Sequence, residues 1–99
     1  MSSKARTQMA ITKNEAIEKA KSDLSRRLNV NAADITEDST SEADFPDMAL
    51  GAPREEEMSG QMITRGWRIR LKAKGDTFEY RADKNQIRLH NFRGNNYVV

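Results

Sequence analysis

The stretch from Gly66 to Asp83, GWRIRLKAKGDTFEYRAD, alternates apolar and charged residues in two runs that meet at Gly75-Asp76. Because successive side chains of a strand point to opposite faces, this period of two predicts two β-strands. Glycine accepts a positive φ, so Gly75-Asp76 predicts the tight turn of an antiparallel hairpin. The predicted apolar face consists of Trp67, Ile69, Leu71, Ala73, Phe78, Tyr80 and Ala82.

The segment before this hairpin has the pattern of an amphipathic helix. Thr12-Lys-Asn-Glu15 matches a capping box, in which the threonine hydroxyl and the glutamate side chain each bond to the other residue's amide. Apolar residues then recur at steps of three and four, which predicts a helix over residues 13–28 that ends at Asn29. Its apolar stripe consists of Ile17, Ala20, Leu24 and Leu28. Trp67 is predicted to be a core residue that packs on this stripe rather than a ligand contact.

Two further segments complete the predicted sheet. Residues 35–44 are polar and acidic, which favours an exposed strand whose charges would resist edge-to-edge aggregation. After a turn at 83–86, Ile87 and Leu89 face inward with Arg88 and His90 outward. The fold class is therefore predicted as α+β, with one N-terminal amphipathic helix packed on a three- to four-stranded antiparallel β-meander.

The length of 99 residues predicts one domain. We expect this domain to cover residues 12–90. Residues 1–11 are polar and aperiodic and are expected to form a disordered arm. Residues 91–99 are expected to be a flexible tail, in which Tyr97-Val-Val could add a short strand.

Composition excludes several classes of protein. The chain has no cysteine, so disulfides, thiolate metal sites and a cysteine nucleophile are excluded. It has no run of about 18 apolar residues that would cross a membrane. The first fifteen residues lack an apolar signal core, so a cytoplasmic location is expected, without membrane association.

Charge is segregated along the chain. Residues 34–57 carry nine acids against Arg54 alone, whereas residues 58–99 carry nine Lys/Arg against three acids. Such segregation indicates either internal pairing or a polar partner surface. The candidate face for a polar partner consists of Arg68, Arg70, Lys72, Arg81 and Arg88.

Three interpretations of this basic face remain open. Lysine and arginine side chains would neutralise phosphates and give salt-dependent nucleic-acid binding. However, single-strand binders place aromatic rings on the same surface, and here Trp67, Phe78 and Tyr80 fall on the opposite one. The face could instead be solvated and paired with Glu79 and Asp83, or it could pair across strands with the acidic segment 35–44.

A long loop follows the acidic strand. Loops of this length in a small domain are often functional or disordered. Asp47 could accept hydrogen bonds from backbone amides and fix the turn after Pro46, while Leu50 could plug the edge of the core. A binding role for the loop stays open, and its candidate residues are Pro46, Asp47, Leu50, Gly51, Pro53 and Arg54.

The sequence offers no convincing catalytic set. His90, the only histidine, has no evident serine or carboxylate partner, and the acids at 34–44 lie in polar sequence that would not shift their pKa values. No phosphate-binding glycine loop, zinc spacing or calcium-loop pattern is present. We therefore expect no enzymatic activity, no cofactor and no metal.

The string from Phe45 to Pro53, FPDMALGAP, resembles the signature WPDxSLGCP of an uncharacterised family common in cyanobacteria and other bacteria. In that family the signature is followed by PG(Y/W)x(I/V) and YxYxTD, which here correspond to Gly66-Trp67-Arg-Ile69 and to residues 78–83. The resemblance covers roughly residues 14–90 and implies a fold without an established activity. Family members often occur in exported proteins or lipoproteins. Phe45 replaces the usual tryptophan and Ala52 the frequent cysteine.

Taken together, these patterns favour a small non-enzymatic binding or interaction module, expected to be monomeric, with an unknown macromolecular partner. Weak nucleic-acid binding through the basic face is the alternative function. The partner would contact either the basic face or the long loop.

Overall fold

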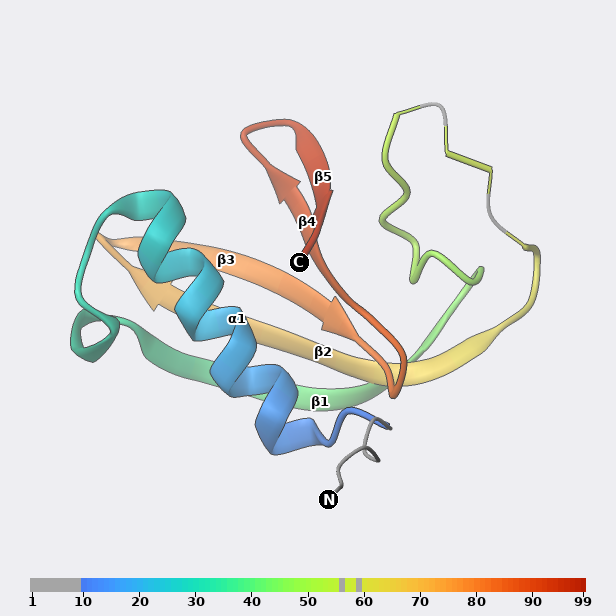
Figure 1. The fold of residues 1–99 in the computed structure, drawn as a ribbon, viewed down its shortest axis with the longest axis horizontal. Helices are drawn as coiled ribbons and strands as arrows, with labels where there is room; N and C mark the ends of the chain where they lie inside the picture. Colours follow the sequence, from blue (N-terminus) through green and yellow to red (C-terminus); the bar gives the residue numbers. More distant parts are fainter. Residues whose placement is uncertain (1–9, 56, 59) are drawn as a thin grey trace, which may run out of the picture.

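The computed structural model describes residues 10–55, 57–58 and 60–99, and in them one helix packs on a five-stranded antiparallel sheet (Figure 1). The strands follow each other in chain order, β1-β2-β3-β4-β5, as a meander. The elements are α1 (Lys13–Leu28), a short 3-10 turn η2 (Ala32–Asp34), β1 (Thr36–Phe45), β2 (Thr64–Ala73), β3 (Asp76–Ala82), β4 (Ile87–Phe92) and β5 (Asn95–Val98). The predicted α+β class is confirmed, with more strands than expected.

The predicted caps define both ends of α1. Glu15 N–H donates to the hydroxyl of Thr12, and Thr12 N–H donates to the carboxylate of Glu15, so the capping box is complete. Asn29 ends the helix in the left-handed conformation, with φ 56°. The residue before the helix N-cap is also held in place, because Ile11 N–H donates to Lys84 O at 2.8 Å. Of the predicted arm, residues 1–11, only residues 10 and 11 belong to the described part of the chain.

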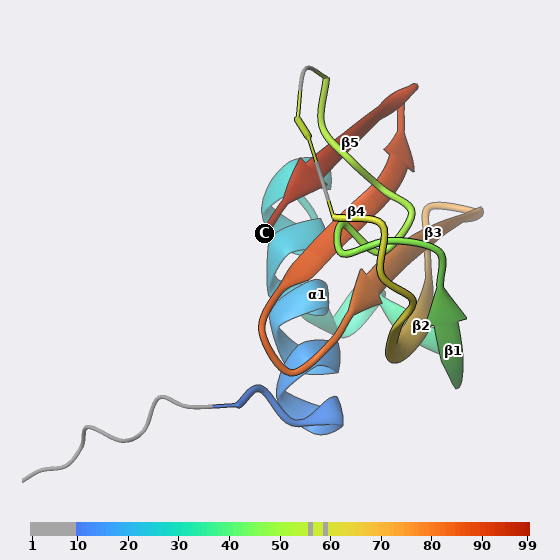
Figure 2. The same ribbon diagram turned by 90° about the vertical axis from the view of Figure 1, so that its right-hand side faces the viewer.

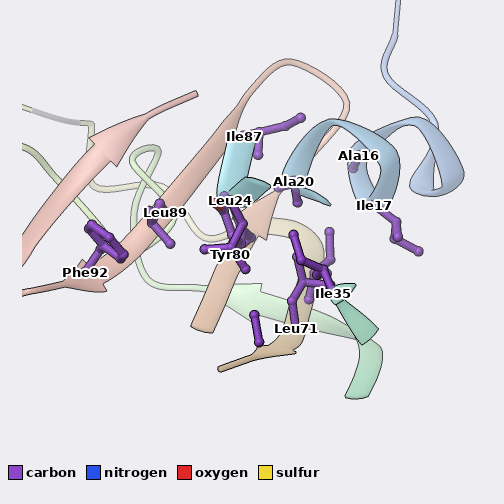
Figure 3. Close-up of a cluster of buried hydrophobic side chains, with 13 residues drawn as sticks. Ala16, Ile17, Ala20, Leu24, Ile35, Leu71, Tyr80, Ile87, Leu89 and Phe92 are labelled. Carbon is purple, nitrogen blue, oxygen red and sulfur yellow. The ribbon is translucent and has the colours of Figure 1, made fainter. Parts of the chain in front are cut away.

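The hydrophobic core lies between α1 and the inner face of the sheet. Ala20 and Leu24 of the helix are fully buried against Leu71, Tyr80 and Leu89 (Figure 3). The alternation of the hairpin therefore placed the apolar residues of β2 and β3 on the correct face. The hairpin turn lies one residue before the predicted Gly75-Asp76, because Asp76 pairs with Ala73 as the first residue of β3. Lys74 and Gly75 form the turn, and both adopt the positive φ that a tight hairpin needs.

A buried hydrogen bond joins the helix to the centre of the sheet. The hydroxyl of Tyr80 donates to Asp23 Oδ2 at 2.8 Å, and Arg27 Nε donates to the same oxygen at 2.6 Å. Burial, together with the hydrogen bond and the negative charge of Asp23, raises the pKa of Tyr80 above its ordinary value. The buried carboxylate of Asp23 is thus paired rather than isolated, as a charge in a core must be.

The acidic segment forms β1, at the edge of the sheet. It pairs antiparallel with β2, from Thr36 opposite Lys72 to Phe45 opposite Thr64, with an irregularity between Glu37 and Ser39. The predicted exposed strand at 35–44 is therefore confirmed. The interpretation that acidic and basic segments pair across strands is confirmed with it, because Lys72 Nζ lies 3.5 Å from Asp38 Oδ1.

The tail differs from the prediction. Residues 91–99 were expected to be flexible, whereas Asn95–Val98 pair with β4 as β5 and Val99 N–H donates to Ile87 O at 2.9 Å. A turn at Arg93-Gly94, both with positive φ, reverses the chain between the two strands. The ring of Tyr97 stacks edge-on to Phe92, with the Arg27 guanidinium 4.4 Å from its centroid. These contacts with distant residues order a segment that is polar in sequence.

The loop between β1 and β2 packs on part of the face of the sheet opposite α1, over Arg81 and Arg88. Phe45, Ala49, Leu50 and Ala52 are buried there, outside the cluster that packs on the helix. Figure 1 shows this yellow-green segment at the end of the sheet where β1 ends and β2 begins, and in Figure 2 α1 lies to one side of it. The loop thus covers only part of this face, because Arg70 and Lys72 of β2 stay exposed on it. Among the described residues, none of the helices has the length and apolar character needed to cross a membrane.

Candidate functional site

The predicted basic face exists, but its cations are bound to groups of the protein itself. Arg68, Arg70 and Arg81 converge on Glu79, at N–O distances of 3.3, 3.2 and 2.8 Å. Burial alone would raise the pKa of Glu79, but hydrogen bonds from Arg81 and Arg70 and the charge of Arg68 outweigh it and hold the pKa below its ordinary value. One carboxylate thus holds three guanidinium groups in place, although it neutralises only one of their three charges.

An aromatic ring lies against the same arginines. The guanidinium carbons of Arg68 and Arg81 lie 5.6 and 5.5 Å from the ring centroid of Phe45, and Phe45 is fully buried. Cations within about 6 Å of a ring face are attracted by its quadrupole. The last residue of β1 therefore fills the middle of the basic face, where a base would otherwise stack.

Arg88 is buried under the loop. It is 6% exposed, and its two terminal nitrogens donate to Glu57 at 2.6 and 2.8 Å, while one of them also lies 3.3 Å from Ala52 O. The hydrogen bonds from Arg88, and next the one from Arg54 N–H, lower the pKa of Glu57 from 4.5 to about 2. Arg88 is consequently inaccessible to an external partner, and its assignment to a partner face is corrected.

The candidate loop has a structural role at most of its predicted positions. Asp47 Oδ1 accepts from Ala49 N–H and Gly51 N–H at 2.9 and 3.0 Å, as predicted. Arg81 donates to the carbonyls of Leu50 and Gly51 at 3.1 and 3.0 Å. Leu50 is fully buried, although it plugs the outer face of the sheet and not the helix-side core. Of the remaining candidates, Pro46 lies under Gly51, whereas Pro53 and Arg54 are exposed.

His90 lies on this partly covered face beside Glu79 of the neighbouring strand. Its Nδ1 is buried without a hydrogen-bond partner in the described part of the chain, and burial together with the charge of Arg81 lowers the pKa of His90. A neutral imidazole is therefore favoured. In the same described part, no cluster of three or more His, Asp or Glu side chains is placed to hold a metal ion.

An open groove of about 650 Å³ lies at the end of the sheet where the loop returns to β2. Three exposed apolar side chains line it: Met48, Met62 and Ile63, which are 50%, 63% and 72% exposed. Its other walls are the start of β2, including Trp67, and the β3–β4 turn, residues 83–86. Clefts of this volume accommodate a small molecule or one to two large side chains.

The walls of the groove are held by short hydrogen bonds. Asp83 Oδ1 accepts from Asn85 N–H and Gln86 N–H at 2.8 and 3.0 Å, which fixes the β3–β4 turn. The side-chain amide of Gln86 donates to Met48 O at 2.6 Å and joins that turn to the loop. The groove therefore has a rigid polar frame and flexible methionine side chains, which adapt to apolar ligands of different shape.

Trp67 departs in part from its predicted core position. It packs against the core cluster, but it is only partly buried and also lines the groove. No described lining residue belongs to α1, so the helix does not cover this end of β2. The alternation of apolar and charged residues predicted the correct face of the sheet for Trp67. It does not indicate how far along that face the helix extends.

Sequence reasoning missed the groove altogether. Met48 and Met62 lie at opposite ends of a loop that the sequence marks only as polar and long. The two methionines come close together because the two ends of the loop are joined by a hydrogen bond from Met48 N–H to Gly60 O at 2.9 Å. The stretch also contains Met58 and Leu50, and nothing in the sequence distinguishes the apolar residues that line the groove from those that do not.

A search of curated proteins and a search of solved structures each found no match. A protein-family model described as a domain of unknown function, DUF8738, matches residues 17–90. This range runs from Ile17 of α1 to His90 of β4, so it includes most of the helix, the long loop and every wall of the groove. The chain belongs to this family, the domain of unknown function DUF8738.

Proposed function

We propose that this protein is a non-enzymatic binding module that holds an apolar segment of a partner protein in the groove formed by Met48, Met62, Ile63 and Trp67. The main supporting observation is that exposed apolar side chains line a groove whose walls are joined by hydrogen bonds. Exposed apolar clusters rimmed by polar residues are typical of interaction sites. The ion pairs of the basic face argue against that face as the main contact.

Peptide display tests this proposal. A library of linear peptides is panned against the wild-type protein, and the enriched peptides are titrated by following Trp67 fluorescence. Ile63→Glu places a charge in the groove and should weaken binding at least tenfold, because burying an unpaired carboxylate is costly. Met58→Glu is the matched control, since Met58 is 97% exposed and does not line the groove. A library without enrichment, or equal losses in both variants, would contradict the proposal.

Nucleic-acid binding through Arg68, Arg70 and Lys72 receives less support, since each of these cations has a carboxylate within 3.5 Å. Titration with single-stranded DNA and RNA at low salt separates the two functions. Affinity that falls steeply between about 50 and 200 mM salt would favour the nucleic-acid alternative.

The finer features predicted from the sequence remain proposals. The likeness of the Phe45–Pro53 string to the bacterial signature supports a bacterial origin for the chain. The cytoplasmic location and the absence of enzymatic activity stay predictions.

A further inference from the structure

β1 leaves one side of the sheet open. It is the edge strand, ten residues long, and in the described part of the chain it pairs only with β2. All its residues before Phe45 are at least partly exposed. An edge strand presents a row of backbone N–H and C=O groups that another strand can pair with.

The charge of this edge selects among possible strands. Residues 34–45 contain five carboxylates and no lysine, arginine or histidine. The neighbouring β2 supplies two cations to these carboxylates: Lys72 pairs with Asp38, and Arg65 pairs with both Glu42 and Asp44. The surplus is negative, and Glu37 accepts its hydrogen bond from the neutral hydroxyl of Thr40. A second copy of this acidic strand would be repelled, whereas a basic strand would be attracted.

The open edge and the groove are adjacent. Glu42 of β1 lies opposite Trp67 of β2, and both residues line the groove. A strand added outside β1 would place every second side chain on the same face as Glu42. One long apolar side chain at such a position would reach past Glu42 toward Trp67, while its neighbours on that face would meet the carboxylates.

We propose that β1 binds an extended, basic segment of a partner protein as a sixth strand, and that an apolar side chain of this segment enters the groove. The inference rests on the proposed function and names its partner class and binding mode. Main-chain hydrogen bonds to β1 supply affinity, and the groove and the carboxylates supply specificity, as in other cases of strand addition to a sheet edge.

The test uses a fluorescein-labelled ten-residue peptide with lysine at every second position and threonine between them. Leucine replaces one central lysine, so that the leucine and the remaining lysines share one face of the added strand. Two control peptides accompany it: one has glutamate in place of lysine, and one has the lysine sequence with alternate backbone amides N-methylated. The lysine peptide should bind with an affinity that falls as salt rises, and both controls should bind at least tenfold more weakly. Equal binding of the N-methylated peptide would overturn the proposal, since that peptide keeps the side chains and loses ladder donors.

Hydrogen exchange followed by NMR locates the bound peptide. In the free protein, amides of β1 that point toward β2 should exchange slowly and the alternate, outward amides quickly. The lysine peptide should slow the outward amides of residues 39–44 at least tenfold. Binding that leaves these amides fast, or that instead protects the outer edge of β5, would overturn the proposal.

Charge variants give an independent measurement. Glu37→Gln combined with Glu42→Gln should weaken the lysine peptide about two- to tenfold at low salt, with the difference vanishing near 1 M salt. Glu18→Gln combined with Glu55→Gln removes the same charge elsewhere and should leave the affinity unchanged. Equal effects of the two double variants would show that only net charge matters and would overturn the proposal.

The two proposals fail in different ways. Display peptides that bind the groove while the outward amides of β1 stay fast would refute strand addition and leave the groove function intact. A lysine peptide that protects β1 and binds the Ile63→Glu variant with unchanged affinity would refute the role of the groove.

Discussion

Gly66 lies where β2 passes so close to β3 that a Cβ atom would be 2.1 Å from Ala82 O. The oxygen belongs to the backbone at the end of β3, so it cannot move aside without shifting the strand. Gly66→Ala should lower the free energy of unfolding by about 2–3 kcal/mol or more, measured by urea denaturation. Gly75→Asn is the control, because the hairpin turn has open space and asparagine tolerates its φ of 79°. A loss below that of the control would contradict the close approach.

The hydroxyl of Tyr80 gives a second prediction for a single residue. Tyr80→Phe removes its hydrogen bond to Asp23 while Arg27 still pairs with that carboxylate. The free energy of unfolding should fall by about 1–2 kcal/mol in urea denaturation. In an Asp23→Asn background, Tyr80→Phe should cost less than in the wild type. Identical costs in the two backgrounds would show that the bond does not couple the helix to the sheet.

The long loop is held to the sheet by polar contacts of two arginines. Arg81 donates to two loop carbonyls and Arg88 donates to Glu57. Hydrogen bonds with a charged partner contribute more than neutral ones, about 1.5–3 kcal/mol each. The loop therefore behaves as a covering layer of the domain, and the groove at its end depends on this attachment.

The attachment should depend on pH. Because the pKa of Glu57 is lowered from 4.5 to about 2, its contribution is complete above pH 4.5 and is lost as the pH falls through 2. Glu57→Gln should lower the melting temperature at pH 7, and the difference from wild type should shrink as pH falls across this window. Calorimetry at several pH values measures this. Glu55→Gln, at an exposed loop position, should follow the wild-type curve throughout.

Local patterns were sufficient to predict the main elements. The capping box and the stripe ending at Leu24 and Leu28 identified α1, and the period of two identified β2 and β3, because in both cases the signal lies within one element. For β5 the sequence offered only the alternative of a short strand at Tyr97-Val-Val beside the expected flexible tail, since Asn95–Val98 is ordered by partners on β4 and by Arg27 of the helix. The strand count was low for this reason.

The candidate site was predicted only in part. Alternation placed Arg68, Arg70 and Arg81 on one face, but whether a cation is free depends on residues far away in sequence. Arg88 is paired 31 positions away with Glu57, and Arg81 with the carbonyl of Leu50, also 31 positions away. Such contacts follow from the closed loop, which local sequence does not encode.

At the scale of the whole molecule, the two edges of the sheet differ in length and charge. β5 has four residues and no charged side chain, whereas β1 has ten residues with four carboxylates. Long edges promote association between copies unless charge opposes it. The expected monomeric state therefore depends mainly on β1.

Partial neutralisation of β1 should change the association state. Glu37→Thr combined with Glu42→Thr removes two like charges and adds two residues that favour strands. We expect dimers or larger species whose fraction rises with concentration in sedimentation velocity experiments, whereas the wild type should remain a monomer. The double variant Glu18→Gln with Glu55→Gln should also remain a monomer. Association of this control would indicate that net charge, rather than the edge, opposes self-assembly.

The buried pair of Arg88 and Glu57 also constrains how sequences of this family can diverge. Loss of Glu57 alone would leave the guanidinium of Arg88 without its carboxylate beneath the loop. Loss of Arg88 alone would remove the hydrogen bonds that hold the carboxylate of Glu57 against the sheet. Substitution at one of these positions is tolerable only when the other changes with it. Descendants of a common ancestor should accordingly inherit the two residues together, or exchange both for a neutral, apolar pair.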